Sequence, residues 1–218
     1  MKSKTAQLIL IRKGRTLLTL WEDFISEPKE SYIVTRVSSH LDFTRPMIDY
    51  VLKDYNQKTE LIGVEIGVAA GDNAFDIMNV LDMKRLYLID PYSLSEYPEY
   101  KPSDQPQFDK VRDTAFELLS QYKNRVEFII KPSRDAVDDV PDNLDFIYID
   151  GNHEYIEVRA DLENYYPKVK KGGIFGGDNF ESECPGVAGA VWEFAVKHNL
   201  DILGARSPLS YEWWVIKK

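Results

Sequence analysis

Residues 61–72 read LIGVEIGVAAGD. The stretch opens with six mostly apolar residues, which favour a short buried strand, and it continues into a turn that contains two glycines. Glycine permits a tight turn and a close approach of the backbone to a ligand, and the helix predicted over residues 74–81 presents its free N–H groups just beyond. A strand, a glycine turn and a helix in this order predict the first unit of a parallel α/β sheet.

The same alternation of strand and helix continues to the end of the chain. The apolar periodicity predicts strands over residues 86–89, 126–130, 144–149 and 174–177, and helices over residues 108–122, 155–165 and 187–198. The glycines at 172 and 173 are expected to end the helix that precedes the strand over 174–177.

Two short β segments, around residues 202–203 and 212–216, predict an antiparallel hairpin at one edge of the sheet. We therefore expect an α/β fold with a doubly wound, Rossmann-like, mostly parallel seven-stranded sheet, which binds its ligands at the carboxyl ends of the strands. The regular pattern begins at Leu41, so residues 41–218 are predicted to form this domain. Residues 1–40 are expected to be a cap or an arm, and a pair of strands is the alternative.

Composition narrows the class of partner. The 218 residues hold 27 basic and 36 acidic side chains, and the formal net charge of −9 disfavours nucleic acid and anionic membranes, which are themselves polyanions. Cys184 is the single cysteine, which excludes an intrachain disulfide and fits a reducing compartment. The first apolar run, Leu8–Ile11, is too short for a signal segment or a membrane span, so we expect a cytoplasmic protein.

Acidic residues mark the first two strands as a binding edge. Glu65 lies within the first strand, and Asp90 ends the second, where a carboxylate suits hydrogen bonds to ribose hydroxyls. The dinucleotide fingerprint G-x-G-x-x-G is not met, because Ala69 takes the place of its second glycine and Asp72 that of its third. Asp72 would repel a pyrophosphate at this helix start, so the turn suits a ligand without phosphate.

The pattern E-x-G-x-x-x-G followed by a strand-ending acid resembles the class I S-adenosylmethionine-dependent methyltransferases, over Leu41 to Lys218. The resemblance implies that S-adenosylmethionine is the cofactor, with its methionine part on the loop 67–71 and its ribose on Asp90. Residues 131–135 follow the third strand, and they begin where that family contacts adenine. Ser133 taken alone is equally well explained as a helix cap. The cofactor-binding residues implied are Glu65, Gly67, Ala69, Gly71, Asp90, Ser133 and Arg134.

A second group of polar residues follows the next two strands. Asp150 ends the strand over 144–149, and Asp178 and Asn179 follow the strand over 174–177. Neighbouring parallel strands lie ~4.8 Å apart, so their carboxyl ends can bring these oxygens together. Two carboxylates and an amide oxygen suit Mg²⁺, whereas the simpler interpretation makes Asp178 and Asn179 a turn after a glycine pair.

This spacing resembles the metal-dependent O-methyltransferases of the catechol O-methyltransferase type, which implies a Mg²⁺ site at Asp150, Asp178 and Asn179. The pattern D-G-x-H-x-Y at 150–155 is similar to that of bacterial small-molecule and sugar O-methyltransferases, in which the histidine is the proposed base. The resemblance therefore gives catalytic roles to His153 and Asp150. Asn179 departs from the Asp-Asp pair that is usual in those enzymes.

The predicted function is transfer of a methyl group from S-adenosylmethionine to a hydroxyl of a small molecule, assisted by Mg²⁺, with His153 as the base. The alternatives are a metal-independent N- or O-methyltransferase of the same fold, a non-catalytic cofactor-binding module, and a nicotinamide-dependent oxidoreductase. The acceptor is not encoded in any motif, and a homo-oligomer is compatible with the sequence. Residues 91–107 are predicted to form a lid, and Trp213 and Trp214 are candidates for lining the acceptor pocket.

Overall fold

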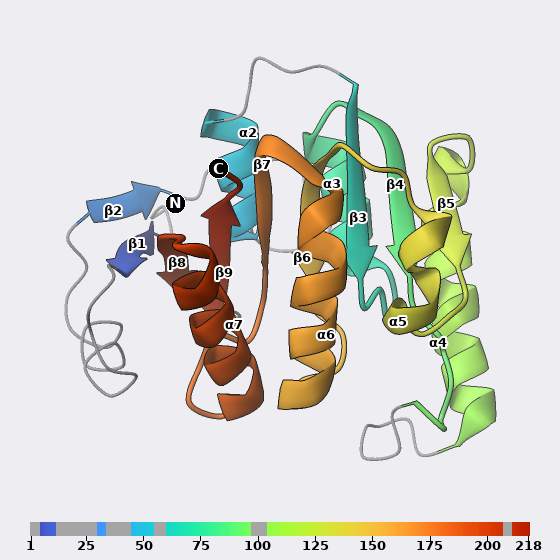
Figure 1. Ribbon diagram of the computed structural model, residues 1–218. Helices are drawn as coiled ribbons and strands as arrows, with labels where there is room; N and C mark the ends of the chain where they lie inside the picture. Colours follow the sequence, from blue (N-terminus) through green and yellow to red (C-terminus); the bar gives the residue numbers. More distant parts are fainter. Residues whose placement is uncertain (1–4, 12–29, 34–44, 55–59, 97–103, 207–210) are drawn as a thin grey trace.

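The computed structural model describes residues 5–11, 30–33, 45–54, 60–96, 104–206 and 211–218. These residues form one sheet with helices packed on both of its faces (Figure 1). Among them, no helix is both long enough and apolar enough to span a bilayer.

Within the described residues, the sheet contains nine strands in the spatial order β2-β1-β8-β9-β7-β6-β3-β4-β5. Their bounds are β1 Thr5–Ile11, β2 Glu30–Ile33, β3 Leu61–Ile66, β4 Met83–Ile89, β5 Val126–Ile129, β6 Leu144–Ile149, β7 Val169–Gly177, β8 Ile202–Arg206 and β9 Tyr211–Ile216. Strands β3 to β7 pair in parallel, whereas β9 pairs antiparallel with β7 and with β8. The predicted fold of seven strands, mostly parallel and with a C-terminal antiparallel hairpin, is confirmed in β3 to β9.

The sheet extends further than the sequence indicated. β1 pairs antiparallel with β8 and with β2, so the β8–β9 hairpin is not at the edge of the sheet. Of the interpretations considered for residues 1–40, strands are therefore present at Thr5–Ile11 and Glu30–Ile33, and they belong to the same sheet as the rest. The division into an arm and a domain at residue 41 stays a prediction.

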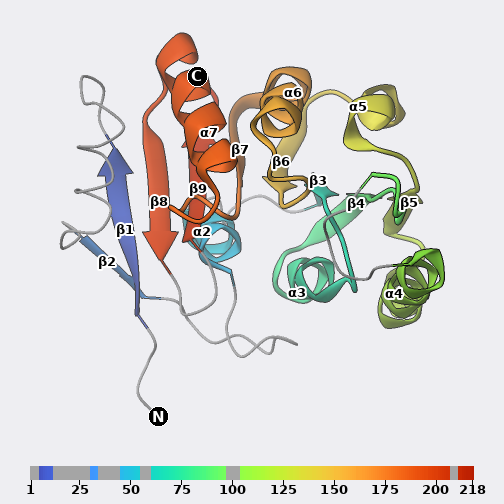
Figure 2. The ribbon, with the colours of Figure 1, turned by 90° about the horizontal axis from the view of Figure 1, so that it is seen from below.

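In the described part of the chain, three α-helices cover each face of the sheet. Their bounds are α2 Pro46–Asp54, α3 Asp72–Val80, α4 Gln105–Leu118, α5 Ser133–Ala136, α6 Tyr155–Tyr165 and α7 Pro185–His198. One apolar core lies under α5, α6 and α7, and a second lies under α2, α3 and α4, as the two rows of helices in Figure 2 show. Burial on both faces explains why β3 and β6 are apolar along nearly their whole length.

Strand β9 contributes one tryptophan to each core. Trp213 packs edge-to-face on Phe175 with ring centroids 6.0 Å apart, and Trp214 lies 5.2 Å from the Tyr50 ring on the opposite face. Both indoles are buried. Alternation along a strand that is covered on both faces places both of them in the interior, and their predicted role in lining an acceptor pocket stays a prediction.

Strand β7 begins at Val169, five residues earlier than predicted. Gly172 and Gly173 lie inside the strand rather than at the end of the preceding helix. The Gly172 N–H donates to the Lys217 carbonyl at 2.7 Å, and the Lys217 N–H donates to the Gly173 carbonyl at 2.9 Å. This pairing with the C-terminal residues recruits the glycines into the sheet, and a local pattern cannot reveal it.

Candidate functional site

The glycine turn between β3 and α3 lies against the end of β6. Gly67, Ala69 and Gly71 all have positive φ, at 85°, 47° and 88°. A Cβ atom on Gly67 would lie 2.0 Å from the Asp150 carbonyl oxygen, so only glycine allows this approach. The loop predicted to bind the cofactor is therefore held directly beside Asp150, the residue predicted to act on the acceptor.

Asp90, at the end of β4, fixes this loop by hydrogen bonds to the backbone. Its Oδ2 accepts the N–H groups of Val68 and Ala69, both at 3.0 Å, and its Oδ1 accepts the N–H of Tyr92 at 2.8 Å. The Tyr92 hydroxyl donates to the Ala69 carbonyl at 2.9 Å. Burial raises the pKa of Asp90, and the three N–H donors oppose that effect. Its predicted role in binding ribose stays a prediction, because its observed contacts are to the loop itself.

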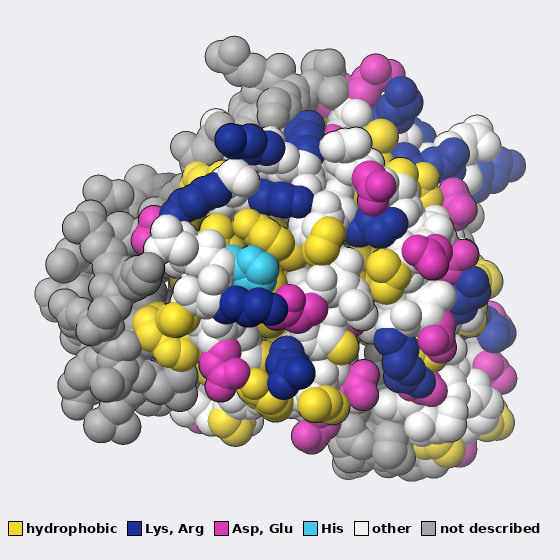
Figure 3. All heavy atoms as spheres, viewed as in Figure 1, with side chains coloured by type: hydrophobic (Ala, Val, Ile, Leu, Met, Phe, Trp, Pro, Cys, Tyr) yellow, Lys and Arg dark blue, Asp and Glu magenta, His cyan; other side chains and the backbone are white. Residues whose placement is uncertain are grey.

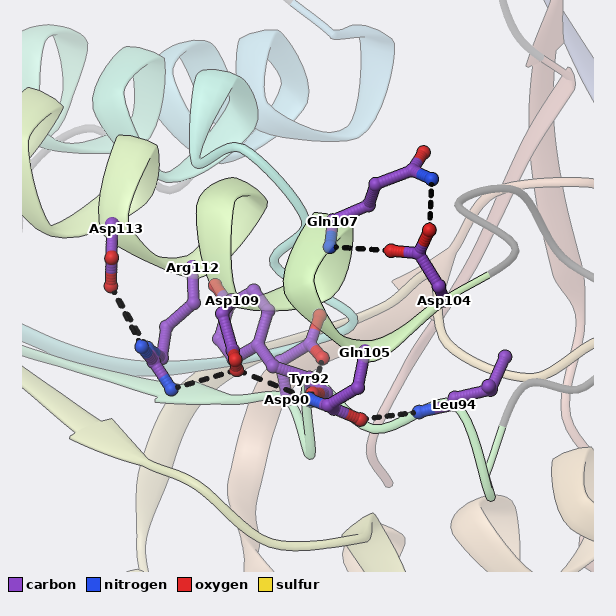
Figure 4. A network of polar contacts seen from close by, with 9 residues as sticks. All are labelled: Asp90, Tyr92, Leu94, Asp104, Gln105, Gln107, Asp109, Arg112 and Asp113. Atoms are coloured by element: carbon purple, nitrogen blue, oxygen red, sulfur yellow. Dashed lines mark hydrogen bonds and ion pairs between the residues drawn. The ribbon is translucent and has the colours of Figure 1, made fainter.

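The segment after Asp90 is tied to the start of α4 (Figure 4). Gln105 donates to the Tyr92 carbonyl at 2.9 Å and accepts the Leu94 N–H at 3.1 Å. Asp104 caps α4 by accepting the Gln107 N–H at 3.0 Å. Of the lid predicted over residues 91–107, residues 97–103 lie outside the described residues, and Gln105 already begins a helix. Residues 105–107 therefore belong to a helix rather than to a loop, and the lid itself stays a prediction.

Glu65 lies inside the protein beneath the glycine turn. Its Oε1 accepts a hydrogen bond from Asn73 at 3.0 Å, and its Oε2 is buried without a hydrogen-bond partner. Burial raises the pKa of Glu65 to about 8. The hydrogen bond from Asn73 lowers this pKa, whereas the charge of Asp150 raises it further. The side chain is therefore mostly protonated at neutral pH and can donate as well as accept.

A pocket opens at the carboxyl edge between the ends of β3, β4, β5 and β6. Its lining includes Ser133 and Arg134 from α5, together with Pro91, Gly151 and Asn152. The two residues predicted to bind near adenine thus lie in one pocket with the residues that follow Asp150.

Polar contacts fix both of these α5 residues. Arg134 forms ion pairs with Glu96 at 2.9 Å and with Glu157 at 3.8 Å. These ion pairs connect α5 to α6 and to the segment after β4 around the pocket. The Ser133 hydroxyl donates to Asp161, whose pKa burial raises to about 7.

His153 follows Asp150 by three residues and stays close to it. Its Nε2 lies 3.8 Å from Asp150 Oδ1, and its Nδ1 lies 3.8 Å from the Cys184 sulfur. The imidazole is about 29 % exposed, so a bound molecule can reach it. Burial raises the pKa of Asp150, and the hydrogen bond with His153 partly offsets that effect.

An arginine for which the sequence predicted no role lies between two of the residues predicted to bind Mg²⁺, Asp150 and Asp178. Arg45, directly before α2, forms an ion pair with Asp178 Oδ2 through Nη1, and its Nη2 lies 3.6 Å from Asp150 Oδ2. Its Nη1 lies 3.7 Å from Glu212 Oε1, and its Cζ lies 5.8 Å from the centre of the Tyr148 ring. The guanidinium thus occupies the place between the two aspartates.

Glu212 and Tyr148 complete this buried group. Glu212 on β9 accepts the Met47 N–H at 2.7 Å and the Tyr148 hydroxyl at 3.0 Å. Burial raises the pKa of Glu212 to about 8, with Arg45 acting in the opposite direction. Burial alone would lower the pKa of Arg45, but the surrounding acidic groups outweigh that effect and raise it.

The observed arrangement does not fit Mg²⁺ at this position. The ion needs oxygens at ~2.0–2.1 Å, whereas the facing oxygens of Asp150 and Asp178 are directed at the Arg45 guanidinium. Asn179 has a positive φ of 61°, and its Oδ1 is buried without a hydrogen-bond partner. Within the part of the chain that the structure describes, no group of three or more His, Cys, Asp or Glu side chains is placed to hold a metal.

Comparison with known proteins identifies the class. The model of a family described as "Methyltransferase domain" matches residues 64–180, which is more than half of the chain. The chain therefore belongs to this methyltransferase family. The matched region begins within β3 and ends at Phe180, so it contains the glycine turn, Asp90, Asp150 and His153.

Individual relatives are distant. An uncharacterized protein, R132, of Acanthamoeba polyphaga mimivirus is 28 % identical over 125 residues, which is 57 % of this chain and 54 % of that protein. The match thus spans about half of that relative.

Two solved structures share the fold. An O-methyltransferase from Bacillus cereus in complex with SAH has a TM-score of 0.52 and 17 % identity, with 72 % of this chain and 74 % of that chain covered. An rRNA methylase from Streptococcus thermophilus has a TM-score of 0.52 and 12 % identity, with coverages of 73 % and 88 %. At these identities the likeness shows the fold alone.

Proposed function

We propose that the protein transfers a methyl group from S-adenosylmethionine to a hydroxyl of a small, uncharged molecule, with His153 as the general base. The observation that carries this proposal is that His153 faces Asp150 at the carboxyl edge, on either side of Gly151 and Asn152, which line the pocket, in a chain of the methyltransferase family. The SAH bound in the Bacillus cereus O-methyltransferase supports the choice of cofactor.

Several residues at this end of the sheet support S-adenosylmethionine as the cofactor. The glycine turn is held in place by Asp90, Glu65 Oε2 is a buried polar atom in need of a partner, and Ser133 and Arg134 line the pocket. When bound, S-adenosylmethionine supplies a methyl group on a positively charged sulfur. Gly151 and Asn152 line the same pocket and connect Asp150 to His153, so cofactor and acceptor are expected to meet beside these two side chains.

In this proposal His153 removes the proton of an acceptor hydroxyl. Its hydrogen bond to Asp150 puts the proton of the neutral imidazole on Nε2, so the lone pair is on Nδ1, on the side of the Cys184 sulfur. Nδ1 would take the hydroxyl proton, and the oxygen would accept the methyl group that S-adenosylmethionine supplies, leaving S-adenosylhomocysteine. Asp150 then stabilises the charged imidazole. Holding the oxygen in line with the methyl group contributes ~7–11 kcal/mol in well-oriented reactions.

The charges around Arg45 favour an uncharged acceptor. Three acidic side chains, Asp150, Asp178 and Glu212, surround this one guanidinium, so the acceptor side offers no excess positive charge to a phosphate. On the face formed by α6 and α7, acidic and basic side chains are interspersed (Figure 3). Together with the net charge of −9, these features support a small molecule rather than a nucleic acid as the acceptor.

The test combines binding with turnover. The full chain is titrated with S-adenosylhomocysteine in a calorimeter, and methyl transfer to a panel of hydroxyl and amine compounds is followed by mass spectrometry. His153→Ala should lower turnover by ~10²–10⁴ and leave binding of S-adenosylhomocysteine unchanged. His198→Ala is the control, because His198 pairs with Glu163 at the other end of α7.

The outcomes separate the candidate functions. Binding without transfer to any compound would favour a non-catalytic cofactor-binding module, and transfer to amines alone would favour an N-methyltransferase. Absence of binding would refute the assignment of the cofactor. The Mg²⁺-assisted form of the reaction is the remaining alternative, and the variants of Arg45 described below decide it.

A further inference from the structure

The acceptor side of the carboxyl edge contains a permanent cation. Arg45 is held from three directions, by Asp178 after β7, Asp150 after β6 and Glu212 on β9. Its side chain is only 20 % exposed, so this is an interior ion pair rather than a surface one. An interior arginine with three acidic neighbours is fixed in place, because moving it would leave buried charges without a partner.

The two aspartates need a positive charge between them. Asp178 and Asp150 end adjacent parallel strands, and the hydrogen bonds of their backbone N–H groups, to Ile149 and Ile66, hold them at the sheet edge. Two carboxylates at the ends of neighbouring strands repel each other unless a cation lies between them. In a metal-dependent site that charge is a divalent ion, whereas here the Arg45 guanidinium occupies the position.

A guanidinium suits this position for a geometric reason as well. It is planar, always charged and carries five N–H donors, so it can bind one carboxylate with each terminal nitrogen. Nη1 pairs with Asp178 while Nη2 faces Asp150. The Tyr148 ring lies 5.8 Å from its Cζ, and the Tyr148 hydroxyl donates to Glu212, which holds the third acidic group in place.

We propose that Arg45 takes the place of a divalent cation in the acceptor site, where it neutralises Asp150 and Asp178 and holds them in the geometry that His153 requires. Arg45 is thus a positioning residue, and the acceptor site operates without a bound metal ion. This inference rests on the proposed function, because a positioning role requires a methyl-transfer site. Its test measures the binding of a metal ion, which is independent of methyl transfer.

The experiment titrates the full chain and its variants with Mn²⁺ and measures free Mn²⁺ by electron paramagnetic resonance. The unaltered protein should show no Mn²⁺ site with a dissociation constant below about 1 mM, which corresponds to a binding free energy of ~4 kcal/mol. Arg45→Ala removes the cation between the two aspartates and should bind Mn²⁺ at least about ten-fold more tightly. The double variant Arg45→Ala, Asp178→Asn should lose that gain.

Two further variants separate charge from position. Arg45→Lys keeps the positive charge and should gain no Mn²⁺ site. Arg112→Ala is the matched control, because Arg112 also contacts two carboxylates, Asp109 and Asp113, but on the exposed face of α4. It should bind Mn²⁺ as weakly as the unaltered protein.

One equivalent of tightly bound Mn²⁺ in the unaltered protein, weakened by Asp178→Asn, would overturn the inference. A folded Arg45→Ala protein that gains no Mn²⁺ would overturn it as well. If Arg45→Ala does not fold, the unaltered protein and Asp178→Asn decide alone, because the inference requires both to bind Mn²⁺ equally weakly. Calorimetry with S-adenosylhomocysteine in EDTA tests the proposed function separately, so the failure of one is distinguishable from the failure of the other.

Discussion

The two halves of the carboxyl edge are stabilised in different ways. On the proposed cofactor side, Asp90 binds the backbone N–H groups of the adjacent glycine turn, and the residues involved lie within about one βαβ unit of the sequence. On the proposed acceptor side, Arg45, Asp150, Asp178 and Glu212 form a group of charged side chains from segments far apart in the sequence. The comparison shows that a contiguous motif can define one half of a site while the other half depends on the complete tertiary structure.

Removal of the acceptor-side cation should have the largest effect on stability. Arg45→Ala leaves buried carboxylates without a positive partner and should lower the free energy of unfolding by about 3–5 kcal/mol. Urea denaturation followed by circular dichroism measures this loss. Arg112→Ala, which breaks exposed pairs on α4, should not measurably change the unfolding midpoint. Equal losses in the two variants would contradict the difference between buried and exposed pairs.

The change at Asp90 should cost less, because its partners are neutral backbone N–H groups rather than a buried charge. Asp90→Ala removes the acceptor of three N–H groups and should lower the free energy of unfolding by about 2–3 kcal/mol. It should also weaken S-adenosylhomocysteine binding, because the turn is no longer fixed. Hydrogen exchange of the Val68 and Ala69 amides measures the turn directly. Unchanged protection of these amides would show that Asp90 does not hold the loop.

A smaller effect concerns pH and again involves the cofactor side. Burial raises the pKa of Glu65 from 4.5 to about 8, so between these values the folded state retains a proton that the unfolded state releases. The contribution of Glu65 to the free energy of unfolding is therefore fully present below about pH 4.5, and it is lost as the pH rises towards 8. Glu65→Gln should reduce this slope by at most ~1.4 kcal/mol per pH unit. Urea denaturation between about pH 4.5 and 8 provides the test, and an identical slope in both proteins would contradict it.

The sequence predicted those parts of the fold that local patterns encode. The strand and helix order from β3 to β9 follows from apolar periodicity, and the glycine turn with Asp90 from a short motif. The early start of β7 was missed because Gly172 is recruited by the C-terminal Lys217. The pairing of β1 with β8 is likewise a long-range contact.

The same reason explains the limits at the site. Asp150, His153 and Asp178 could be placed together because they follow adjacent parallel strands. Arg45 lies 133 positions from Asp178 in a stretch without a motif, so nothing local relates it to the aspartates. The position of Glu212 at the site could not be predicted either, since it lies on β9 within an apolar strand pattern. The predicted Mg²⁺ site was inferred from the acidic residues alone, without the cation that accompanies them.

The measurement that tests the central claim most directly is calorimetric titration of the full chain with S-adenosylhomocysteine, in EDTA and then in Mg²⁺. The account predicts one molecule bound per chain with the same affinity in both buffers. Ser133→Phe, which places a ring in the pocket, should weaken binding at least about ten-fold, or ~1.4 kcal/mol. No binding, or equal binding by Ser133→Phe, would contradict the assignment of this pocket to the cofactor.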